Sequence, residues 1–286
     1  MDVIETAQAR PGVAAHSCAG ESVASKIMRL LDAFRDDGIG LGPSEVARRS
    51  GLPYATVHRL LTELVRVGAL QHDDCGRYSI GLRLWEIGAS TPSLIRLRTV
   101  ALPHLQSLAA AGPSRAAHLD VLDNGRGLRL EQMSSRQAVL AAGDAATFPL
   151  HATSGGQVLL AHSATAVVDH LLAQPLLQFT PRTVTVPDHL RVVLAGVRRV
   201  GVAISDGAYR PGQVDIAAPV FGAEGAVVAS IELVLPAGTD PRQHVAAVRS
   251  AAAALTARLR SGQRQPTAKA ASKAAAGGSN IRSATN

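Results

Sequence analysis

Aromatic residues and cysteines are scarce in this sequence, and each shortage excludes a class of protein. Aromatic side chains make up 3% of the 286 residues and apolar residues 47%, so alanine, valine and leucine must form most of the core. The two cysteines, Cys18 and Cys75, lie in a polar leader and in a predicted turn, and no Cys-x-x-Cys pair occurs. We therefore expect neither a disulfide framework nor a zinc site, and we predict a reducing, cytoplasmic location.

Long apolar runs and catalytic motifs are also missing. No run approaches the roughly 18 apolar residues of a membrane span, and residues 1–22 carry Asp2 and Glu5 where a signal peptide needs basic residues. The sequence holds no G-x-S-x-G, H-E-x-x-H, Walker or complete G-x-G-x-x-G motif. We predict that the chain is not an enzyme, binds no cofactor or metal ion and has no membrane partner. The alternative is a hydrolytic or small-molecule-binding enzyme with an added helical N-terminus.

The net charge of +7 is spread unevenly along the chain. Residues 261–286 carry four basic residues and no acidic one, while residues 20–90 carry nine of each. The excess charge is therefore no argument for nucleic-acid binding unless the basic groups of residues 20–90 share one face. The tail "QRQPTAKAASKAAAGGSNIRSATN" has low complexity and is predicted to be disordered. It either adds a weak nonspecific attraction for DNA or serves only as a solubilising tail.

Residues 20–90 have the order helix, helix, tight turn, helix and β-hairpin. A first helix begins at Val23, and Ser44 is placed to cap a second, short helix, "SEVARRS". A third helix follows Pro53 and ends at Gly68, and "ALQH" and "RYSI" then flank a turn, which indicates a hairpin. Two helices joined by a tight turn form a helix-turn-helix, and the hairpin makes it the winged form.

The third helix has two faces of opposite character. Val57, Leu60, Leu61 and Leu64 recur at i, i+3, i+4 and i+7, which predicts a buried face. The opposite face is rich in hydrogen-bond donors, and in a helix-turn-helix this helix enters the major groove. The residues predicted to contact base edges or phosphates are Ser25, Lys26, Ser44, Arg48, Pro53, Tyr54, Ala55, Thr56, His58, Arg59, Thr62, Arg77 and Tyr78. A face that only meets solvent, or a winged helix that binds a protein partner, is the alternative.

Four stretches carry a resemblance to a known family. "GLPYATVHRLLTELVRVGAL" and "GRYSIGLRLWEIG" resemble the DNA-binding domain of the IclR family of bacterial transcription regulators. "PLHATSGGQVLLA" and "GAYRPGQVDIAAPVFGAEGAVVASI" resemble its effector-binding domain, and the resemblance covers residues 23–260. One departure is Tyr54-Ala55, where the family more often has a small polar or basic pair, and this difference affects the preferred bases.

The resemblance implies an α+β two-domain architecture: an N-terminal winged helix-turn-helix, a linker helix and a C-terminal GAF-like α/β effector-binding domain. The predicted parts are a flexible leader (1–19), the DNA-binding domain (20–82), the linker helix (83–97), the effector-binding domain (98–260) and a disordered basic tail (261–286). The implied partners are a double-stranded DNA operator, a small-molecule effector that controls operator binding, and further copies of the chain in a dimer or tetramer. Repressor and activator both remain open.

The second half of the chain predicts one sheet flanked by helices. "RAAHLDVL" and "GLRLEQMSS" are strands joined by an Asp-Asn-Gly turn, and "RQAVLAA" is a further strand. "GVAISD", "QVDIAAPVF" and "AVVASIELVLP" are three later strands. Helices are expected at residues 93–110, after a cap at Thr153 or Ser154, in "VPDHLRVVLAGVRRV", and after a cap at Asp240.

A ligand pocket is expected around the helix that begins "TSGGQV". Small residues there leave backbone N–H groups open, which suits an anion. Carrying the family pocket over by motif gives the predicted effector-binding residues Ser154, Gly155, Gly156, Ser205, Asp206, Asp215, Glu232 and Val234. The family usually has Cys where Asp215 stands, small polar residues near Glu232, and Lys where Gln157 stands. A plain glycine-rich helix start is the alternative.

Asp215 and Glu232 lie inside otherwise apolar strands, and alternation puts Val214 and Ile216 on the face opposite Asp215. A carboxylate that faces a core is costly unless it is paired or ligated. Our hypothesis is a ligand with hydrogen-bond donors, such as an amine, an amidine or a polyol. Alternatively, these acids pair with an internal arginine, such as Arg129 or Arg210, or one of them faces solvent.

Overall fold

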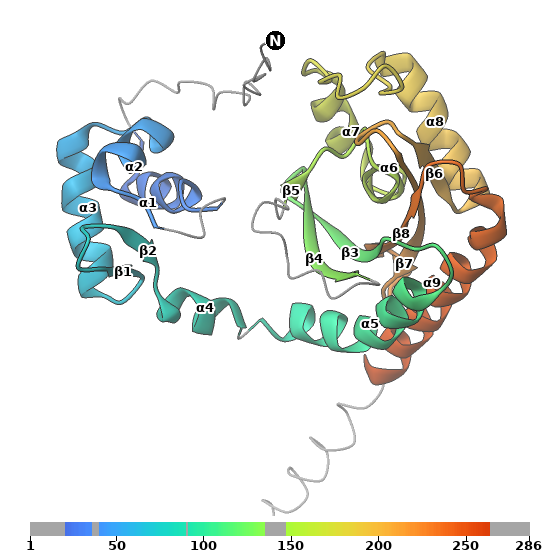
Figure 1. The fold of residues 1–286 in the computed structure, drawn as a ribbon, viewed down its shortest axis with the longest axis horizontal. Helices are drawn as coiled ribbons and strands as arrows, with labels where there is room; N and C mark the ends of the chain where they lie inside the picture. The colour runs from blue at the N-terminus through green and yellow to red at the C-terminus, as the bar shows by residue number, and fades with distance from the viewer. Residues whose placement is uncertain (1–20, 36–39, 90, 135–146, 264–286) are drawn as a thin grey trace, which may run out of the picture. The chain divides into compact units, whose positions relative to one another are not determined.

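The computed structural model describes residues 21–35, 40–89, 91–134 and 147–263 (Figure 1). The chain divides into two compact units, residues 1–90 and residues 91–286. Within the described residues, no helix is both long enough and apolar enough to cross a membrane.

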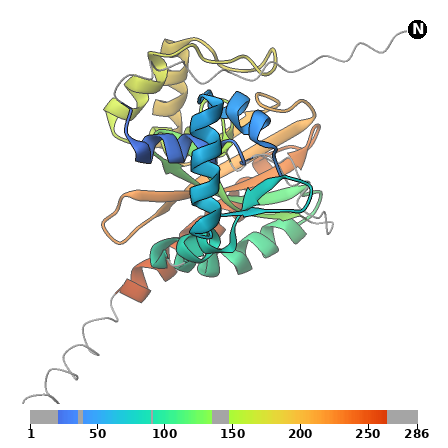
Figure 2. The ribbon, with the colours of Figure 1, turned by 90° about the vertical axis from the view of Figure 1, so that its left-hand side faces the viewer.

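The first unit has the predicted order of elements. Its helices and strands are α1 (Val23–Asp32), α2 (Pro43–Ser50), α3 (Tyr54–Arg66), β1 (Leu70–His72), β2 (Tyr78–Ile80) and α4 (Leu82–Ala89). β1 and β2 pair antiparallel, and Leu41 forms an additional bridge to Tyr78. Figure 2 shows α3 upright with the hairpin beside it. These elements confirm the winged helix-turn-helix.

Apolar side chains from α1, α2, α3 and the hairpin form the core of this unit. Leu30, Val46, Val57 and Leu61 are among its fully buried members, which confirms the predicted inner face of α3. The prediction that Ser44 caps α2 is wrong. Gly42 is the N-cap, two residues before Ser44, and as a glycine it has no side chain to make a capping hydrogen bond. Pro43 is favourable at the first helical position, so the helix starts there.

Close backbone packing joins the end of α3 to the start of α4. The Gly81 N–H donates to the Ala69 carbonyl at 2.9 Å, and a Cβ at Gly81 would lie 2.4 Å from the Gly68 oxygen. Arg83 Nη1 donates to the Val67 carbonyl at 2.7 Å, at the C-terminal end of α3. The linker helix α4 is therefore attached directly to the helix that carries the predicted DNA contacts.

The second unit contains a six-stranded sheet in which every neighbouring pair is antiparallel. In sheet order the strands are β5 (Thr147–Phe148), β4 (Arg126–Ser134), β3 (Ala116–Asp123), β8 (Val227–Pro236), β7 (Gln213–Phe221) and β6 (Ala203–Asp206). The predicted Asp-Asn-Gly hairpin is present, with positive φ at Asn124 (47°) and Gly125 (78°). The predicted strand "RQAVLAA" lies outside the described residues.

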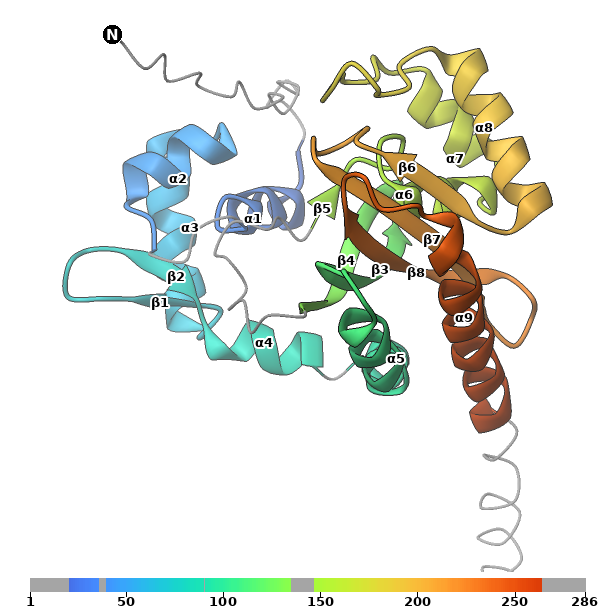
Figure 3. The same cartoon turned by 45° about the vertical axis from the view of Figure 1, so that its right-hand side comes forward.

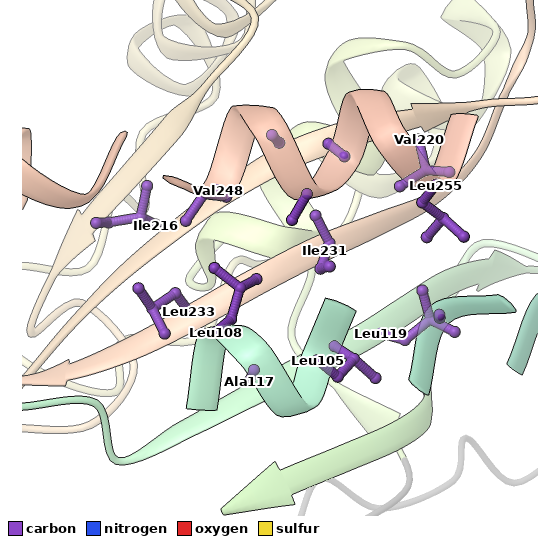
Figure 4. Packing of buried hydrophobic residues seen from close by; sticks show 14 of the residues in the cluster. Leu105, Leu108, Ala117, Leu119, Ile216, Val220, Ile231, Leu233, Val248 and Leu255 are labelled. Atoms are coloured by element: carbon purple, nitrogen blue, oxygen red, sulfur yellow. The ribbon is translucent and has the colours of Figure 1, made fainter. Parts of the chain in front are cut away.

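Helices cover both faces of the sheet (Figure 3). They are α5 (Pro92–Ala110) and α9 (Arg242–Gln263) on one face, and α6 (Ser154–Ala161), α7 (Thr165–Leu172) and α8 (Pro187–Val200) on the other. Figure 4 shows Leu105 and Leu108 of α5 and Val248 and Leu255 of α9 packed over the strands. The short strand β5 and the helix α7 were not predicted.

Residues of β7 alternate between the two faces. Val214 and Ile216 belong to the core beneath α5 and α9, and Ala217 belongs to the core on the α6 side. The predicted alternation is thus confirmed, and Asp215 lies on the same face of the sheet as α6. This face carries the polar residues of the candidate ligand site.

Candidate functional site

The exposed face of α3, with Pro53 at its N-cap, contains seven of the predicted DNA contacts. All of these are exposed except Thr56, which is half-buried, while four apolar residues of α3 are buried beneath them. Tyr54 is 54% exposed, and its ring centroid lies 6.4 Å from that of His58. The first two turns of α3 therefore present an aromatic ring, an imidazole and the Arg59 guanidinium together.

The arginines of this unit differ in whether an acid already neutralises them. Arg66 is ion-paired with Glu63 at 2.7 Å. Arg48 Nε donates to Glu45 at 2.8 Å and Arg49 Nε donates to the same carboxylate at 2.6 Å. These hydrogen bonds from Arg48 and Arg49 lower the pKa of Glu45 to about 2.

Three basic residues keep their charge available for phosphates. Lys26, Arg59 and Arg77 make no ion pair with any residue that the structure describes. Arg48 is also exposed, so it presents its guanidinium together with the Glu45 carboxylate. The basic side chains of this unit that no described acid neutralises thus include one each on α1, α3 and the wing.

The remaining predicted contacts lie at the ends of elements. Ser25 is in the first turn of α1, where its N–H donates to the Ser22 hydroxyl at 3.1 Å. In the wing, Asp73 Oδ1 accepts from the Arg77 N–H at 2.8 Å and orders the turn. The Tyr78 ring packs 4.5 Å from the His72 ring and partly against the core. Ser44 is exposed in the first turn of α2.

In the second unit, strand register gathers polar residues in rows across the face that meets α6. Glu232 lies between His118 and Ala217, and Asp215 lies between Ser205 and Val234. Asp120 lies between Ser230 and Arg129, because a register shift between Leu119 and Asp120 skips one residue of β4. Such a bulge re-aims side chains, and here it turns Arg129 toward the acids.

Glu232 is the best-connected residue of this cluster. Its Oε1 accepts from the Ser154 hydroxyl at 2.8 Å and from the Gly155 N–H at 2.9 Å. Its Oε2 lies 2.8 Å from His118 Nδ1 and 3.3 Å from Arg129 Nη2. Burial by itself raises the pKa of Glu232, but His118, Arg129 and the Gly155 N–H outweigh it and lower the pKa to about 2. Glu232 is therefore ionised and occupied on both oxygens.

The glycines at the start of α6 allow this close approach. A Cβ at Gly155 would lie 2.8 Å from Asp120 Oδ2, and a Cβ at Gly156 would lie 2.4 Å from the Leu150 oxygen. Thr153 caps the helix by accepting from the Gly156 N–H at 3.1 Å. Two of the N–H groups that were expected to bind a ligand anion are thus taken: the Gly155 N–H by the Glu232 carboxylate and the Gly156 N–H by the Thr153 hydroxyl.

Arg129 supplies the positive charge for the neighbouring acids. Its Nε donates to Asp120 Oδ1 at 3.0 Å. Burial raises the pKa of Asp120 to about 6, against the lowering effect of Arg129. Ligand atoms of His118, Asp120 and Glu232 lie within 4.8 Å of one another, a spacing that could hold a metal ion. Any such ion would have to displace the guanidinium, so the arrangement favours an internal ion pair.

A cavity of about 100 Å³ opens beside this cluster. It is lined by Arg115, Ala116, His118, Arg129, Gln132, Thr153, Tyr209, Arg210, Gln213, Asp215, Glu232 and Val234. Asp215 is 7% exposed, and its Oδ1 has no hydrogen-bond partner among the described residues. Burial, with a smaller contribution from the nearby Glu232 charge, raises the pKa of Asp215 to about 8, against the lowering effects of Arg129 and Arg210. Asp215 is therefore the unsatisfied group at the wall of this cavity.

The structure brings some predicted effector contacts together and separates others. Asp215, Glu232 and Val234 line the cavity. Ser154 and Gly155 lie at Glu232, and Gly156 packs on Leu150. The Ser205 hydroxyl donates to the Ala152 carbonyl at 3.1 Å instead of the cavity. Asp206 is exposed at the edge strand β6, where Arg182 binds it at 2.5 Å.

Several residues of the site were missed by sequence reasoning. His118, Asp120, Arg115, Gln132 and Tyr209 were not predicted, and Arg129 and Arg210 were considered only as partners for the acids. The sequence signal that could have found them was the recurrence of polar residues inside the strands, in "HLD" of β3 and "RLEQ" of β4. Glu232 pairs with Arg129, which agrees with the alternative that we stated for the core acids, namely neutralisation by an internal arginine.

Replacing Asp215 with asparagine should change how stability depends on pH. The folded state keeps a proton on Asp215 from about pH 4 to about pH 8, where an unfolded chain has lost it, so wild-type stability falls as pH rises through this window. The Asn variant lacks this loss. We expect its melting temperature to match the wild type near pH 5 and to exceed it by roughly 10 °C near pH 9. Parallel melting curves of the two proteins against pH would contradict a buried, proton-binding Asp215.

Two features of the described chain define its class. A winged helix-turn-helix with an exposed polar recognition helix precedes an α/β domain with a polar cavity, which is the architecture of a ligand-controlled DNA-binding regulator. The family model of the IclR helix-turn-helix domain matches residues 23–74. The model of the bacterial transcriptional regulator IclR C-terminal domain matches residues 90–267. The chain belongs to the IclR family of transcriptional regulators.

Individual relatives agree with this assignment. The chain is 34% identical to the glycerol operon regulatory protein of Streptomyces coelicolor, over 78% of this chain and 90% of that protein. It is 29% identical to the HTH-type transcriptional regulator XynR of Escherichia coli, over 73% and 83%. An IclR homolog from Microbacterium hydrocarbonoxydans, solved in complex with 4-hydroxybenzoate, is 34% identical, with a TM-score of 0.76 over 84% of this chain and all of that one (100%).

These findings confirm the predicted fold class and function. The protein is a transcriptional regulator with a helix-turn-helix DNA-binding domain and a C-terminal effector-binding domain, and its operator binding is under control of a small molecule. Its relatives are transcriptional regulators rather than enzymes, which confirms the prediction on enzymatic activity.

Proposed function

We propose that the first half of α3 reads the operator and that an effector in the cavity beside Asp215 controls this reading. One observation carries the DNA part: the exposed polar face of α3 lies opposite four buried apolar residues in a winged helix-turn-helix. The N-terminal residues of such a helix contact base edges in the major groove. Pro53, Tyr54, Ala55, Thr56, His58, Arg59 and Thr62 are the proposed groove contacts.

Phosphate contacts are proposed for the residues around this helix. Ser25 and Lys26 lie on α1, Ser44 and Arg48 on α2, Tyr78 on the wing strand β2, and Arg77 directly before that strand. Serine hydroxyls, helix N-termini and exposed basic side chains are the usual donors to phosphate oxygens. Because Arg48 shares its charge with Glu45, we expect it to contribute less than Lys26 or Arg77.

The effector site is proposed at the cavity lined by Asp215, Glu232 and Val234. One support is the Asp215 carboxyl, whose Oδ1 has no hydrogen-bond partner among the described residues. The other is the similar IclR homolog from Microbacterium hydrocarbonoxydans, which was solved in complex with 4-hydroxybenzoate. Ser154, Gly155 and Gly156 support the site by holding Glu232, and Ser205 and Asp206 flank it on β6. An effector regulates only if it binds more strongly to one of two arrangements of the protein.

Self-association is proposed to use the linker helix α4. Three large apolar side chains of this short helix are exposed, namely Leu82 (60%), Trp85 (67%) and Ile87 (59%). An exposed apolar cluster of this kind marks an interaction surface. A second copy of α4 is the natural partner, because helix-turn-helix dimers read two half-sites by two-fold symmetry. Pairing of two dimers into a tetramer is the further possibility.

Changing Trp85 to serine tests this interface. We expect the variant to shift from dimer to monomer at micromolar concentration, because truncating a central aromatic anchor costs about 2 kcal/mol or more of binding energy. Sedimentation velocity measures the change in mass. The matched control is Val192→Ser on α8, which removes an equally exposed apolar side chain (69%) from another element. A Trp85→Ser protein that remains dimeric would show that α4 is not the contact.

The proposed domain boundaries remain those of the sequence: the DNA-binding domain at 20–82, the linker at 83–97 and the effector-binding domain at 98–260. The contacts of Gly81 and Arg83 with the end of α3 support α4 as the element that transmits the effector signal. The protein is placed in the cytoplasm because its operator DNA is there.

Fluorescence anisotropy tests the proposal. The full chain is titrated onto labelled DNA from upstream of its own gene and onto scrambled DNA of equal length, at several salt concentrations. Preferential binding that weakens steeply with salt is expected, since phosphate contacts release counterions. Equal, feeble binding to both DNAs, with and without candidate effectors, would point instead to a protein partner for the winged helix.

A further inference from the structure

A groove that shares no lining residue with the cavity beside Asp215 lies at the edge of the sheet. The pairing of β6 with β7 begins at Ala203 and Ala217, and β7 continues to Phe221 with no described strand beside it on that side. The groove follows this part of β7, between the C-terminal ends of α6 and α8 and one face of α9. Its volume is about 490 Å³, which lies within the range of small-molecule sites.

Three arginines line this groove, and no acidic residue of the described chain does. Arg198 lies in the last turn of α8, and Arg249 and Arg260 lie on α9. All three are exposed, and none makes an ion pair with any residue that the structure describes. Positive charges that share one groove repel each other, so an anion with several charges would stabilise this arrangement.

Backbone carbonyls hold each of these three side chains in place. Arg198 Nε donates to the carbonyl of the last residue of α6 at 2.6 Å, and Arg249 Nη2 donates to the carbonyl of the last residue of α8. Arg260 Nε donates to the Gly222 carbonyl at 3.2 Å. A guanidinium has five N–H donors, and each of these hydrogen bonds uses only one of them. The arginines are thus oriented, and their other donors can bind an anion.

One face of α9 forms the long wall of the groove. Arg249, Ala253, Thr256 and Arg260 recur at i, i+4, i+7 and i+11, so they lie along this face. The eleven residues from the first arginine to the second span about 16 Å of helix, and the side chains between them are small. The groove therefore suits an elongated molecule with an anionic group at each end.

The edge of β7 at this groove is poorly suited to the addition of a further strand. Pro219 has no N–H to donate, and the Phe221 N–H donates to Thr256 Oγ1 at 3.0 Å. The His162 ring packs edge-on at 5.7 Å from the Phe221 ring, and its Nε2 is buried without a hydrogen-bond partner among the described residues. The groove thus offers arginine and imidazole side chains to a small molecule rather than a backbone ladder to a peptide.

We propose that this groove is a second ligand site, which binds an elongated small organic molecule with two phosphate groups. One phosphate binds Arg249 and the other binds Arg260, because guanidinium groups bind phosphate oxygens through paired N–H donors. Arg198 adds the third positive charge. Two phosphate groups carry about three to four negative charges near pH 7, which matches three arginines without acidic partners better than two carboxylates do. The proposal does not rest on the effector site beside Asp215.

Matched compounds test the need for both phosphate groups. Isothermal titration calorimetry on the full chain, at constant ionic strength, uses fructose 1,6-bisphosphate, fructose 6-phosphate and fructose, and a second series of ribulose 1,5-bisphosphate, ribulose 5-phosphate and ribulose. In at least one series we expect the bisphosphate to bind about tenfold more tightly than the monophosphate, and the free sugar to show no binding. Because this comparison uses the wild-type protein, it does not depend on whether a variant folds.

Variants on α8 and α9 then locate the bound molecule. Arg249→Gln and Arg260→Gln should each weaken the bisphosphate about tenfold and reduce its advantage over the monophosphate. Arg198→Gln should weaken both phosphates. The controls are Arg258→Gln on α9 and Arg199→Gln on α8, which remove the same charge from exposed arginines of the same helices that do not line the groove. Neither control should change affinity, and melting temperatures of all variants establish that they are folded.

Three results would overturn the proposal. The first is equal affinity of the bisphosphate, the monophosphate and the free sugar in both series. The second is an equal loss of affinity in the groove variants and their controls, which would indicate only a general attraction between opposite charges. The third is no binding of any compound, which would leave the arginines as caps for the backbone carbonyls that they hold. Failure of operator reading is recognised separately, because these titrations contain no DNA.

Discussion

Replacing Glu232 with alanine is expected to lower the melting temperature of the effector-binding domain by about 10 °C. The change leaves Arg129, His118, the Ser154 hydroxyl and the Gly155 N–H without their shared acceptor inside the domain. Removing one partner of a buried ion pair costs about 3–5 kcal/mol, and each kcal/mol corresponds to roughly 2–4 °C for a domain of this size. Circular dichroism of the full chain during heating measures the loss.

Two further variants separate the buried network from ordinary surface charge. Glu232→Gln keeps an acceptor oxygen but loses the negative charge, so its melting temperature should lie between those of wild type and Glu232→Ala. Asp169→Ala breaks the exposed ion pair with Arg191, which is 3.0 Å long, and should cost about 2 °C or less. If Glu232→Ala melts as the Asp169 variant does, the network contributes no more than a surface pair.

The pH dependence of this loss has a defined sign. The pKa of Glu232 is lowered from 4.5 to about 2 in the folded protein, so its ionised form stabilises the fold above about pH 4.5. This stabilisation decreases as pH falls toward 2. The difference between wild type and Glu232→Gln should therefore shrink as pH falls below about 4.5.

Replacing Arg59 with alanine is expected to weaken operator binding about 10- to 100-fold. Arg59 lies on the exposed face of α3 with no ion pair among the described residues, so its guanidinium is free to bind the groove. Removing a base-contacting arginine costs affinity and relaxes specificity at that position. Fluorescence anisotropy with operator and scrambled DNA measures both effects, since the ratio between the two DNAs should fall with the affinity.

Arg66→Ala is the matched control on the same helix. Arg66 lies at the C-terminal end of α3, where Glu63 binds it at 2.7 Å, and its removal should change affinity less than threefold. The salt dependence distinguishes two roles of Arg59. A base contact leaves the slope of affinity against salt nearly unchanged, whereas a phosphate contact reduces it by about one. Equal effects of the two variants would contradict a reading role for Arg59.

Most of the fold could be predicted because its signals are local. The spacing of Val57, Leu60, Leu61 and Leu64 placed α3, and the Asp-Asn-Gly turn placed the β3–β4 hairpin. β5 escaped prediction because two residues are too few to show a period. The cap of α2 was wrong by two residues, since Pro43 and Ser44 are both acceptable near a helix start and only the backbone geometry chooses between them.

The candidate ligand site was predicted less completely than the DNA-binding face. Asp215, Glu232 and Val234 line the cavity as the motif suggested, but Asp206 lies at the surface with Arg182. A strand residue near a sheet edge cannot be assigned to pocket or solvent from its own sequence. His118, Asp120 and Arg115 were missed because they lie on β3 or just before it, far along the chain from the other site residues.

The sequence by itself determined the family, the winged helix-turn-helix and the opposite faces of α3, because these depend on neighbours within a few residues of one another. Only the tertiary structure decided the state of the buried acids. His118 and Glu232 are 114 residues apart and meet through the β3–β8 register. Arg129 faces Asp120 because a bulge skips one residue of β4, and a shift of one residue moves a side chain to the other face. Partner choice in a sheet depends on such long-range register, so the internal neutralisation of Glu232 and the unsatisfied state of Asp215 became visible only in three dimensions.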